Sequence, residues 1–593
     1  DNGPPDPDLS DFVKDCNEKY AYPRIIVSTA SEMCRELEKR YGDSIPKVAG
    51  DFTPYWEDGA GSSARETAVN REAAERLVQA EALYAMLNPG GYPAEEFYEA
   101  WRNVILYDEH TWGAHCSISQ PDSDFTNAQW KIKQAFALDA DTQSRKLLSD
   151  SLARRRAETG KITTVDVFNT CSWEQSDLVI LPKNWNLGGN VVVNSRGEIV
   201  PTQRLCTGEI AFISRNVPSL SAERFTLKAS ALPSKSSPAL VEASSATLSN
   251  YYLTVKIDEA TGAISSLKHK NMGDDLVAGK GGIGLNDYFY VSGRDPKDLQ
   301  RNGPVTATVK EAGPFVASLV IESDAPGCRK LSREVRVIAG LDRVDIIDTI
   351  DKEKVYQQEA VHLAFAFNVP EGVMRMDVPW GVVRPELDQL AGACKNYFTV
   401  QRWVDVSNER LGVTLAVIDA PLIEVGAITN DPWGGVGWIE KLEQTTTLYS
   451  YVMNNYWETN YKAYQDGPTV FRYSIQPHGN FDAAQAAKFG VERSQPLIAV
   501  PVDEETEVQR PAFSVEPANL IVTAFKPSED GKARIIRLFN AGQRREKVRI
   551  TWAKPAPEEV WLSNLAEEQA SKLSGQVEMA PYEFVTLRVP LGK

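Results

Sequence analysis

Apolar residues recur at helical spacing over the first 158 residues and then alternate with polar residues over most of the remaining chain. A period of three to four residues is typical of amphipathic helices, and a period of two is typical of strands with one buried face. Ser28 and Thr29 precede the second helical stretch and are favourable N-cap residues. The predicted helices cover 9–19, 30–41, 64–87, 94–110 and 125–155.

The helical part divides into two segments. Residues 1–60 resemble the closing part of an α/β domain, because the short apolar segment "PRIIVST" between the first two helices predicts a strand. The three later helices are long and joined by short links, which favours a three-helix bundle. The stripes expected to face inward in its first and third helices are Ala73, Leu77, Ala80, Tyr84 and Leu87, and Phe125, Ala128, Ile132, Ala135 and Leu138.

The chain beyond Lys161 has the pattern of antiparallel β structure. The turns "EATG" (259–262) and "AGLD" (339–342) each separate two alternating runs and predict hairpins. Such a pattern over more than 400 residues favours several β-sandwich domains, so the expected fold class is multidomain α+β. The predicted domains are 1–60 (end of an α/β domain), 61–158 (helix bundle), 159–236 (small β domain), 237–498 (large sandwich) and 511–593 (C-terminal sandwich).

The net charge and the residue composition exclude some classes of binding partner for this chain. The net charge of −17 is spread along the chain and argues against nucleic acid, whose phosphates would be repelled. No apolar run reaches about 18 residues, so no membrane span is expected. The seven cysteines contain no CxxC pair, which argues against a cysteine-based zinc site and leaves the compartment open. A neutral partner such as a carbohydrate fits this composition, and some of the 13 tryptophans would suit stacking on sugar rings.

The segment "YDEHTWGAHCS" (107–117) holds two of the five histidines. A neutral imidazole commonly binds zinc, and a neighbouring carboxylate can orient its other nitrogen. A single histidine at a helix end also commonly caps carbonyl groups. From the residues alone, both interpretations of His110 and His115 stay open.

Three further segments combine aromatic side chains with carboxylates or amides. Aromatic faces stack on sugars, and carboxylates and amides bind hydroxyl groups. Each segment is also compatible with a structural aromatic cluster or with turn-forming asparagines. The segments are "GDFTPYWEDG" (50–59) with Trp56 and Asp58, "GLNDYFYVSGRD" (284–295) with Tyr288 and Tyr290, and "MNNYWETNYKAYQDG" (453–467) with Asn455 and Trp457. The neighbouring Arg402 and Asp405 are expected to form ordinary ion pairs.

The order of parts and several motifs resemble the retaining α-mannosidases of glycoside hydrolase family 38, particularly bacterial members. The motifs are "DNGPP", "AYPRIIVST", "GDFTPYWEDGAGSSARETAVNR", "YDEHTWGA", "FNTCSWEQSDLV", "QRWVDVSNERLGVTL" and "NNYWETNYKAYQDG". Family members begin with an α/β catalytic domain that carries a His-x-Asp pair and a nucleophilic Asp, and no segment here matches them. The resemblance therefore implies the C-terminal portion of such an enzyme, inactive without the missing N-terminal part.

The resemblance also implies roles for individual residues. Asp1 would be the general acid/base, and Trp56 an aromatic wall beside the sugar. His110 would bind Zn²⁺ with Asp108 as the rival ligand, and a tyrosine, Tyr288 or else Tyr290, would line the pocket. In the implied mechanism a carboxylate attacks the anomeric carbon, an acid protonates the leaving oxygen, and water hydrolyses the glycosyl-enzyme.

The expected partners are a carbohydrate substrate, an α-mannoside or related glycan, and either the missing N-terminal part or a second copy of the chain. Two alternatives remain beside an α-mannosidase. One is a non-catalytic carbohydrate-binding or scaffold chain, which the large β content would suit. The other is a related glycosidase that acts on another sugar.

Overall fold

The computed structural model describes residues 4, 6–53, 55–157, 160–229, 240–430, 436–456 and 460–591. The chain divides into two compact units, Asp1–Asp51 and Phe52–Lys593, which are described separately. Asp1 and Trp457, two of the predicted site residues, lie outside the described residues.

The first unit consists of helices and connecting loops. Helices α1 (Leu9–Lys19) and α2 (Ala30–Tyr41) have the predicted bounds, and a 3₁₀ turn, η1 (Gly42–Ser44), follows. Thr29 caps α2 in a capping box with Glu32, which explains why local sequence is sufficient to start this helix. Neither helix has a buried residue.

The strand predicted at "PRIIVST" is wrong, because residues 23–29 have no strand conformation. A strand needs a neighbouring strand to satisfy its backbone groups, and the described residues of this unit contain none. Instead the side-chain amide of Asn17 binds both backbone groups of Ile25, with an Nδ2–O distance of 2.7 Å and an N–Oδ1 distance of 2.9 Å.

The second unit begins with a 3₁₀ segment and a helix bundle. The elements are η2 (Tyr55–Ser63), α3 (Ala64–Leu87), η3 (Pro89–Gly91), α4 (Ala94–Tyr107) and α5 (Asp124–Ser151). The predicted inward stripe of α3 is confirmed, since Ala73, Leu77 and Ala80 are fully buried. They pack with Phe97 and Val104 of α4 in the core of the bundle.

The predicted inward stripe of α5 is wrong. Phe125 and Ile132 are 62% and 63% exposed, and Leu138 is also exposed. The buried face of α5 consists of Thr126, Lys133, Ala137, Ala140, Ser144, Leu147 and Ser151. This face is partly polar because its side chains find partners on other elements. For example, Lys133 Nζ donates to the carbonyl of Glu109 at 2.8 Å.

A small β domain follows the bundle. One sheet has the order β27-β1-β7-β3-β4 and the other the order β2-β6-β5, and their apolar faces share one core. The strands are β1 (Thr164–Asn169), β2 (Gln175–Leu181), β3 (Val191–Asn194), β4 (Ile199–Val200), β5 (Thr202–Arg204), β6 (Ile210–Val217), β7 (Ser221–Lys228) and β27 (Ile498–Pro501).

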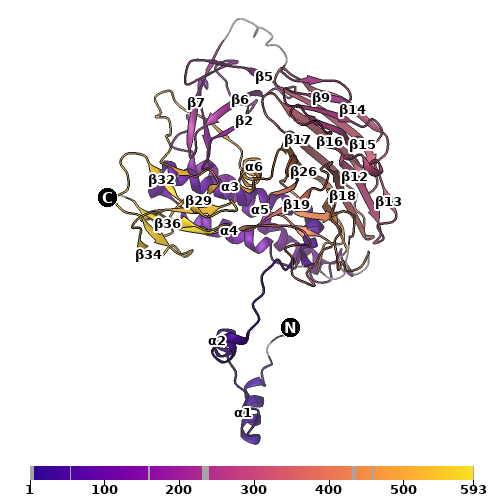
Figure 1. Cartoon of the computed structure of the whole chain (residues 1–593), viewed down its shortest axis with the longest axis vertical. Helices are drawn as coiled ribbons and strands as arrows, with labels where there is room; N and C mark the ends of the chain where they lie inside the picture. Colours follow the sequence, from indigo (N-terminus) through magenta and orange to yellow (C-terminus); the bar gives the residue numbers. More distant parts are fainter. Residues whose placement is uncertain are drawn as a thin grey trace. The chain divides into compact units, whose positions relative to one another are not determined.

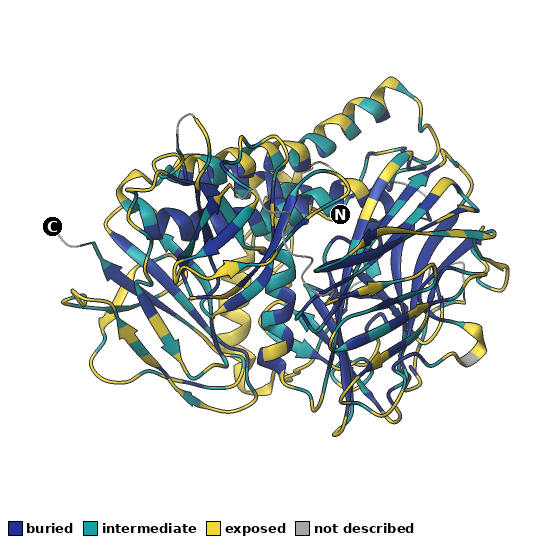
Figure 2. Ribbon diagram, turned by 90° about the horizontal axis from the view of Figure 1, so that it is seen from above, coloured by how far each residue is buried: buried dark blue, intermediate teal, exposed yellow. Residues whose placement is uncertain are grey.

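The largest domain is a sandwich of two antiparallel sheets that enclose a common apolar core. The first sheet, in order, contains β21 (Phe398–Thr399), β24 (Leu422–Val425), β25 (Thr447–Asn454), β18 (Glu359–Ala366), β12 (Leu285–Ser292), β11 (Ile264–His269), β10 (Leu253–Ile257), β9 (Thr247–Ser249) and β8 (Glu242–Ala243), with β13 (Leu299–Gln300) paired to β12. The second contains β14 (Val305–Ala312), β15 (Val316–Ala325), β16 (Cys328–Ile338), β17 (Val344–Lys352), β26 (Gly467–His478), β23 (Gly412–Val417), β22 (Trp403–Ser407), β19 (Val373–Val378) and β20 (Gly381–Val383). Figure 2 shows the buried strands of this sandwich in dark blue.

Both predicted hairpins of the sandwich are confirmed. Strands β10 and β11 pair on either side of "EATG", and β16 and β17 pair on either side of "AGLD". A short turn element, η4 (Lys280–Gly282), lies between β11 and β12. Helix α6 (Ala483–Ser494) follows β26, and Asp482 caps it by accepting from two backbone amides.

The C-terminal strands form a further β domain beside α3 (Figure 1). Its main sheet has the order β29-β30-β36-β33-β34, and two short pairs, β28-β32 and β31-β35, accompany it. The strands are β28 (Phe513–Glu516), β29 (Leu520–Pro527), β30 (Ala533–Asn540), β31 (Glu546–Lys547), β32 (Arg549–Trp552), β33 (Trp561–Ser563), β34 (Gln569–Lys572), β35 (Glu578–Met579) and β36 (Phe584–Pro590). Leu83 and Met86 of α3 pack against Phe525 and Ile536 of this sheet.

The predicted fold class, multidomain α+β with helices before antiparallel sandwiches, is confirmed. None of the described helices has the length and apolar character that a membrane span requires.

Candidate functional site

Three of the segments that the sequence singled out meet on one side of the helix bundle. The η2 segment, the loop after α4 and the segment after β25 are joined by hydrogen bonds, although their bonded residues lie between 56 and 396 positions apart in the chain. Trp112 Nε1 donates to the Trp56 carbonyl at 3.0 Å, and the Ala114 amide donates to the Asn460 carbonyl at 2.9 Å. Asn454 Nδ2 donates to the Asp58 carbonyl at 2.7 Å. The tertiary fold therefore assembles these motifs into one structure.

Glycines allow the three segments to approach so closely. A Cβ atom on Gly113 would lie 2.0 Å from the Asn460 carbonyl oxygen, and one on Gly59 would lie 1.9 Å from the Trp112 ring. A Cβ on Gly61 would lie 2.6 Å from Asn454 Nδ2. These contacts are far shorter than real Cβ contacts, so glycine is required at Gly113, which faces backbone, and a side chain at the other two positions would displace Trp112 or Asn454.

Trp112 holds the loop after α4 in an uncommon conformation. Its φ of 56° lies in the left-handed region, which is unusual for a bulky residue and costs about 1 kcal/mol or more. The ring is 5% exposed and packs edge-on against Tyr107, with ring centroids 6.2 Å apart. Burial of the indole and its hydrogen bond to Trp56 offset the backbone strain, and the loop is thereby fixed two residues from His110.

His110 is exposed at the end of α4. Its side chain is 68% exposed, and its Nδ1 lies 2.6 Å from Glu109 Oε1. A carboxylate at Nδ1 orients the ring and leaves Nε2 available as a metal ligand. Within the described ranges, however, no group of three or more His, Cys, Asp or Glu side chains could hold a metal ion. Zinc usually takes three or four protein ligands. His110 fits one of these ligand positions, but the described residues around it do not complete a zinc site.

Asp108, the rival zinc ligand, has different neighbours from His110. Its Oδ1 accepts from Asn70 Nδ2 at 3.0 Å, and the residue lines a cavity of about 640 Å³ beside α3. The residue keeps exposed surface, but its carboxyl group is crowded by protein atoms. This burial raises the pKa of Asp108 to about 6, against the opposing effect of the Arg71 guanidinium.

The buried residues of the predicted set are bound within the protein. Asp58 is 5% exposed, and its Oδ1 accepts from the Tyr461 hydroxyl at 2.6 Å. Asn455 is 4% exposed; it donates to the carbonyls of Gln357 and Ala463, both at 2.9 Å. The structure therefore gives both side chains a role in holding loops together. Trp56, in contrast, is only half-buried.

The two predicted pocket tyrosines lie on β12 and face the interior of the sandwich. Tyr288 is fully buried, and its hydroxyl donates to the Pro326 carbonyl at 2.7 Å. Tyr290 is 7% exposed and donates to Glu359 Oε2 at 2.8 Å. Burial raises the pKa of both phenols well above the usual value, so both stay protonated donors.

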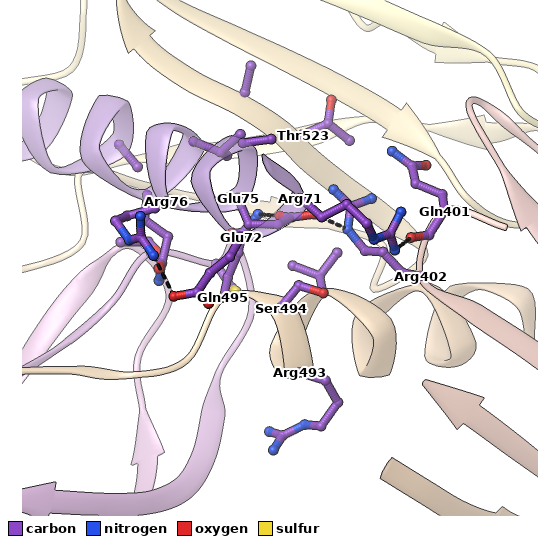
Figure 3. Close-up of a pocket in the computed structure, with 18 of the residues that line it drawn as sticks. Arg71, Glu72, Glu75, Arg76, Gln401, Arg402, Arg493, Ser494, Gln495 and Thr523 are labelled. Carbon is purple, nitrogen blue, oxygen red and sulfur yellow. Dashed lines mark hydrogen bonds and ion pairs between the residues drawn. The ribbon is translucent and has the colours of Figure 1, made fainter. Parts of the chain in front are cut away.

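The cavity beside α3 contains charged residues to which the sequence gave no role (Figure 3). Arg402 was expected to pair locally, but its Nε binds Glu75 of α3 at 2.7 Å. Asp405 instead pairs with His478 at 2.6 Å. No sequence signal links Arg402 to a residue 327 positions away, and only the fold brings the two together.

Family comparisons match two parts of the β region. Residues 248–420 match the glycosyl hydrolases family 38 C-terminal domain. Residues 519–587 match the glycosyl hydrolases family 38 C-terminal beta sandwich domain. A comparison with curated proteins gave no match.

Two solved structures resemble the chain over nearly its whole length. An alpha-mannosidase from Enterococcus faecalis V583 is 15% identical with a TM-score of 0.73, and the match covers 98% of this chain and 74% of that one. A glycosyl hydrolase family 38 protein from Enterococcus faecalis is 15% identical with a TM-score of 0.71, covering 98% and 76%. At this identity the likeness shows a common fold. Two parts of the chain thus match C-terminal domains of glycosyl hydrolases family 38, and the chain shares the fold of these two Enterococcus faecalis proteins.

Proposed function

We propose that this chain belongs to a retaining, zinc-dependent α-mannosidase that hydrolyses α-mannosidic bonds of glycans. The observation that supports the proposal is the position of His110. Its imidazole is exposed on a loop fixed by Trp112, beside the aromatic and carboxylate residues of η2. An exposed, oriented imidazole on a rigid loop is suited to contribute to a site completed by other donors.

The residues of this chain would position groups around the sugar. Glu109 holds Nδ1 of His110 and thereby directs Nε2 outward as one zinc ligand. When bound, zinc would supply a Lewis acid that binds sugar hydroxyl groups. Trp56 retains exposed surface that could stack on the sugar, while Asp58 and Tyr461 hold its segment in place.

A retaining glycosidase also needs two carboxyl groups about 5 Å apart at the scissile bond. Asp1 remains the proposed acid/base, and no residue of the chain is proposed as the nucleophile. We therefore expect the 593-residue polypeptide by itself to be inactive on α-mannosides. Hydrolysis of an aryl α-mannoside at a normal rate by this polypeptide would contradict that expectation.

The zinc assignment is tested by His110→Ala in the full-length enzyme, with His115→Ala as the matched control from the same loop. Loss of a zinc ligand should lower both the zinc content, measured by elemental mass spectrometry, and the activity by about 100-fold or more. His115→Ala should retain both. Full zinc occupancy in His110→Ala would exclude His110 as a ligand and turn attention to Asp108.

Substrate class is tested separately, because fold similarity does not fix the sugar. A panel of aryl glycosides should show preference for the α-mannoside. Preference for another glycoside would favour the related glycosidase. Glycan binding without hydrolysis by the full-length protein would favour a non-catalytic carbohydrate-binding role.

A further inference from the structure

Apart from Asp108, the rival zinc ligand that lines it, the cavity of about 640 Å³ beside α3 has no part in the proposed hydrolysis. Arg71 and Glu75 of α3 lie close to Gln401 and Arg402, which precede β22 (Figure 3). Asp377 of β19 also lines the cavity and interacts with both arginines. Its walls also include apolar and aromatic side chains. Among these are Trp101, Trp173, Trp380, Phe525 and Phe539.

Arg71 is a cation held by neutral groups. Its Nε donates to the Ile418 carbonyl at 3.0 Å, and its Nη2 donates to the carbonyls of Gln401 at 2.5 Å and Val417 at 3.3 Å. Within the described part of the chain, Arg71 forms no ion pair and its Nη1 forms no hydrogen bond. Burial accordingly lowers the pKa of this guanidinium.

Arg402 also has donors to spare. Its Nε binds Glu75 Oε1, and the other carboxylate oxygen of Glu75 accepts from Gln495 Nε2 at 2.7 Å. The terminal nitrogens of Arg402 form no hydrogen bond to the described residues, and its side chain keeps 20% of its surface exposed. Both carboxylate oxygens of Glu75 thus accept a hydrogen bond, while the two terminal nitrogens of Arg402 remain available to a ligand in the cavity.

Two further carboxylates line the cavity, Asp108 and Asp377, and burial raises the pKa of each, so they compensate these cations only in part. Burial raises the pKa of Asp377 to about 7, which lowers the ionised share of this carboxyl group at neutral pH. The other arginines of the cavity are already paired. Arg76 binds Glu72 and Asp141, Arg472 binds Asp419, and Arg493 binds Asp177. Arg493 keeps a buried Nε without a hydrogen-bond partner among the described residues, but its charge is paired, so the unpaired donors of Arg71 and Arg402 are the ones that face this end of the cavity.

We propose that this cavity binds a small molecule through a phosphate group, with Arg71 and Arg402 as the residues that donate to its oxygens. Guanidinium groups match phosphate oxygens in bidentate geometry, and such charge-assisted hydrogen bonds are stronger than bonds to neutral acceptors. The aromatic walls leave room for a sugar ring attached to the phosphate. The proposal does not depend on the hydrolytic activity.

The experiment is a calorimetric titration of the full 593-residue chain with inorganic phosphate and, separately, with a hexose 6-phosphate, at constant ionic strength. Saturable binding with one site per chain is expected, and Arg402→Gln should weaken it about tenfold, the loss of one charge-assisted contact. Arg410→Gln is the control, because the Arg410 side chain is 72% exposed and forms its ion pair with Asp274, away from the cavity lining. It should leave the affinity unchanged.

A second variant keeps the proposal testable if Arg402→Gln fails to fold. Asp377→Asn removes a negative charge beside the anion while preserving side-chain shape, so it should strengthen phosphate binding several-fold at pH 8. Tighter binding of the hexose phosphate than of phosphate would identify a sugar phosphate as the source, and equal binding would identify free phosphate. The proposal is overturned by absence of saturable binding below about 10 mM, by an equal effect of Arg410→Gln, or by unchanged binding in Asp377→Asn.

Discussion

The loop that carries His110 depends on the absence of a side chain at position 113. In Gly113→Ala the new Cβ would meet the Asn460 carbonyl oxygen at 2.0 Å and its carbon at 3.1 Å. Relief of this contact requires a movement of about 1 Å, which disrupts the 2.9 Å hydrogen bond from the Ala114 amide to the same oxygen. The lost hydrogen bond costs about 1 kcal/mol and overpacking about 1–3 kcal/mol. We therefore expect a local destabilisation of about 2–4 kcal/mol.

Native-state hydrogen exchange measures this local cost directly, whereas a global unfolding curve of a multidomain chain would not isolate it. Exchange at the Ala114 amide should accelerate by roughly 30-fold to 1,000-fold, since 1.4 kcal/mol corresponds to a factor of ten. Gly273→Ala is the control, because a Cβ there meets no atom within 4 Å. Unchanged exchange at Ala114 in Gly113→Ala would refute the claim that glycine is required for this contact.

Three further predictions concern charge, packing and a buried hydrogen bond. Burial raises the pKa of Asp377 from 3.8 to about 7, so the folded protein holds this proton at pH values where the unfolded chain has lost it. The free energy of unfolding therefore falls as the pH rises from about 4 to about 7. In Asp377→Asn the melting temperature should fall less over this pH range. Leu147→Ala should cost about 2–5 kcal/mol in the native-state hydrogen exchange of the helix-bundle amides, whereas Ile132→Ala should stay within about 0.5 kcal/mol, because Leu147 is buried and Ile132 is exposed. Tyr461→Phe removes the donor to Asp58 and should cost about 1.5–3 kcal/mol in the hydrogen exchange of the amides around Asp58.

Much of the secondary structure follows from short-range patterns. The bounds of α1, α2 and α3 match the prediction because N-caps and apolar periodicity act within a few residues. The hairpins at 259–262 and 339–342 match for the same reason, since a turn and its flanking alternation fix the pairing locally. The family resemblance likewise rests on contiguous motifs and agrees with the matched domains.

The orientation of α5 could not be derived in this way. Its apolar residues lie on more than one side, and the side that is buried includes Lys133 and Ser144. Ser144 is buried because its hydroxyl accepts from Arg76 Nη1 at 2.8 Å, on a helix 68 residues earlier. A polar residue becomes a core residue when a distant partner satisfies it, and the sequence does not show that partner.

The sequence by itself determined where most elements lie and which segments resemble a glycosidase. Tertiary structure decided what their side chains do. In the folded chain the segment "PRIIVST" has no strand conformation. Asp108 lines the cavity, whereas the His110 side chain is exposed. Arg402 pairs with Glu75 and not with Asp405. The physical reason is the distance along the chain over which each interaction acts. Caps, turns and periodicity act over a few residues, whereas burial, ion pairing and close backbone approach depend on elements tens to hundreds of residues apart.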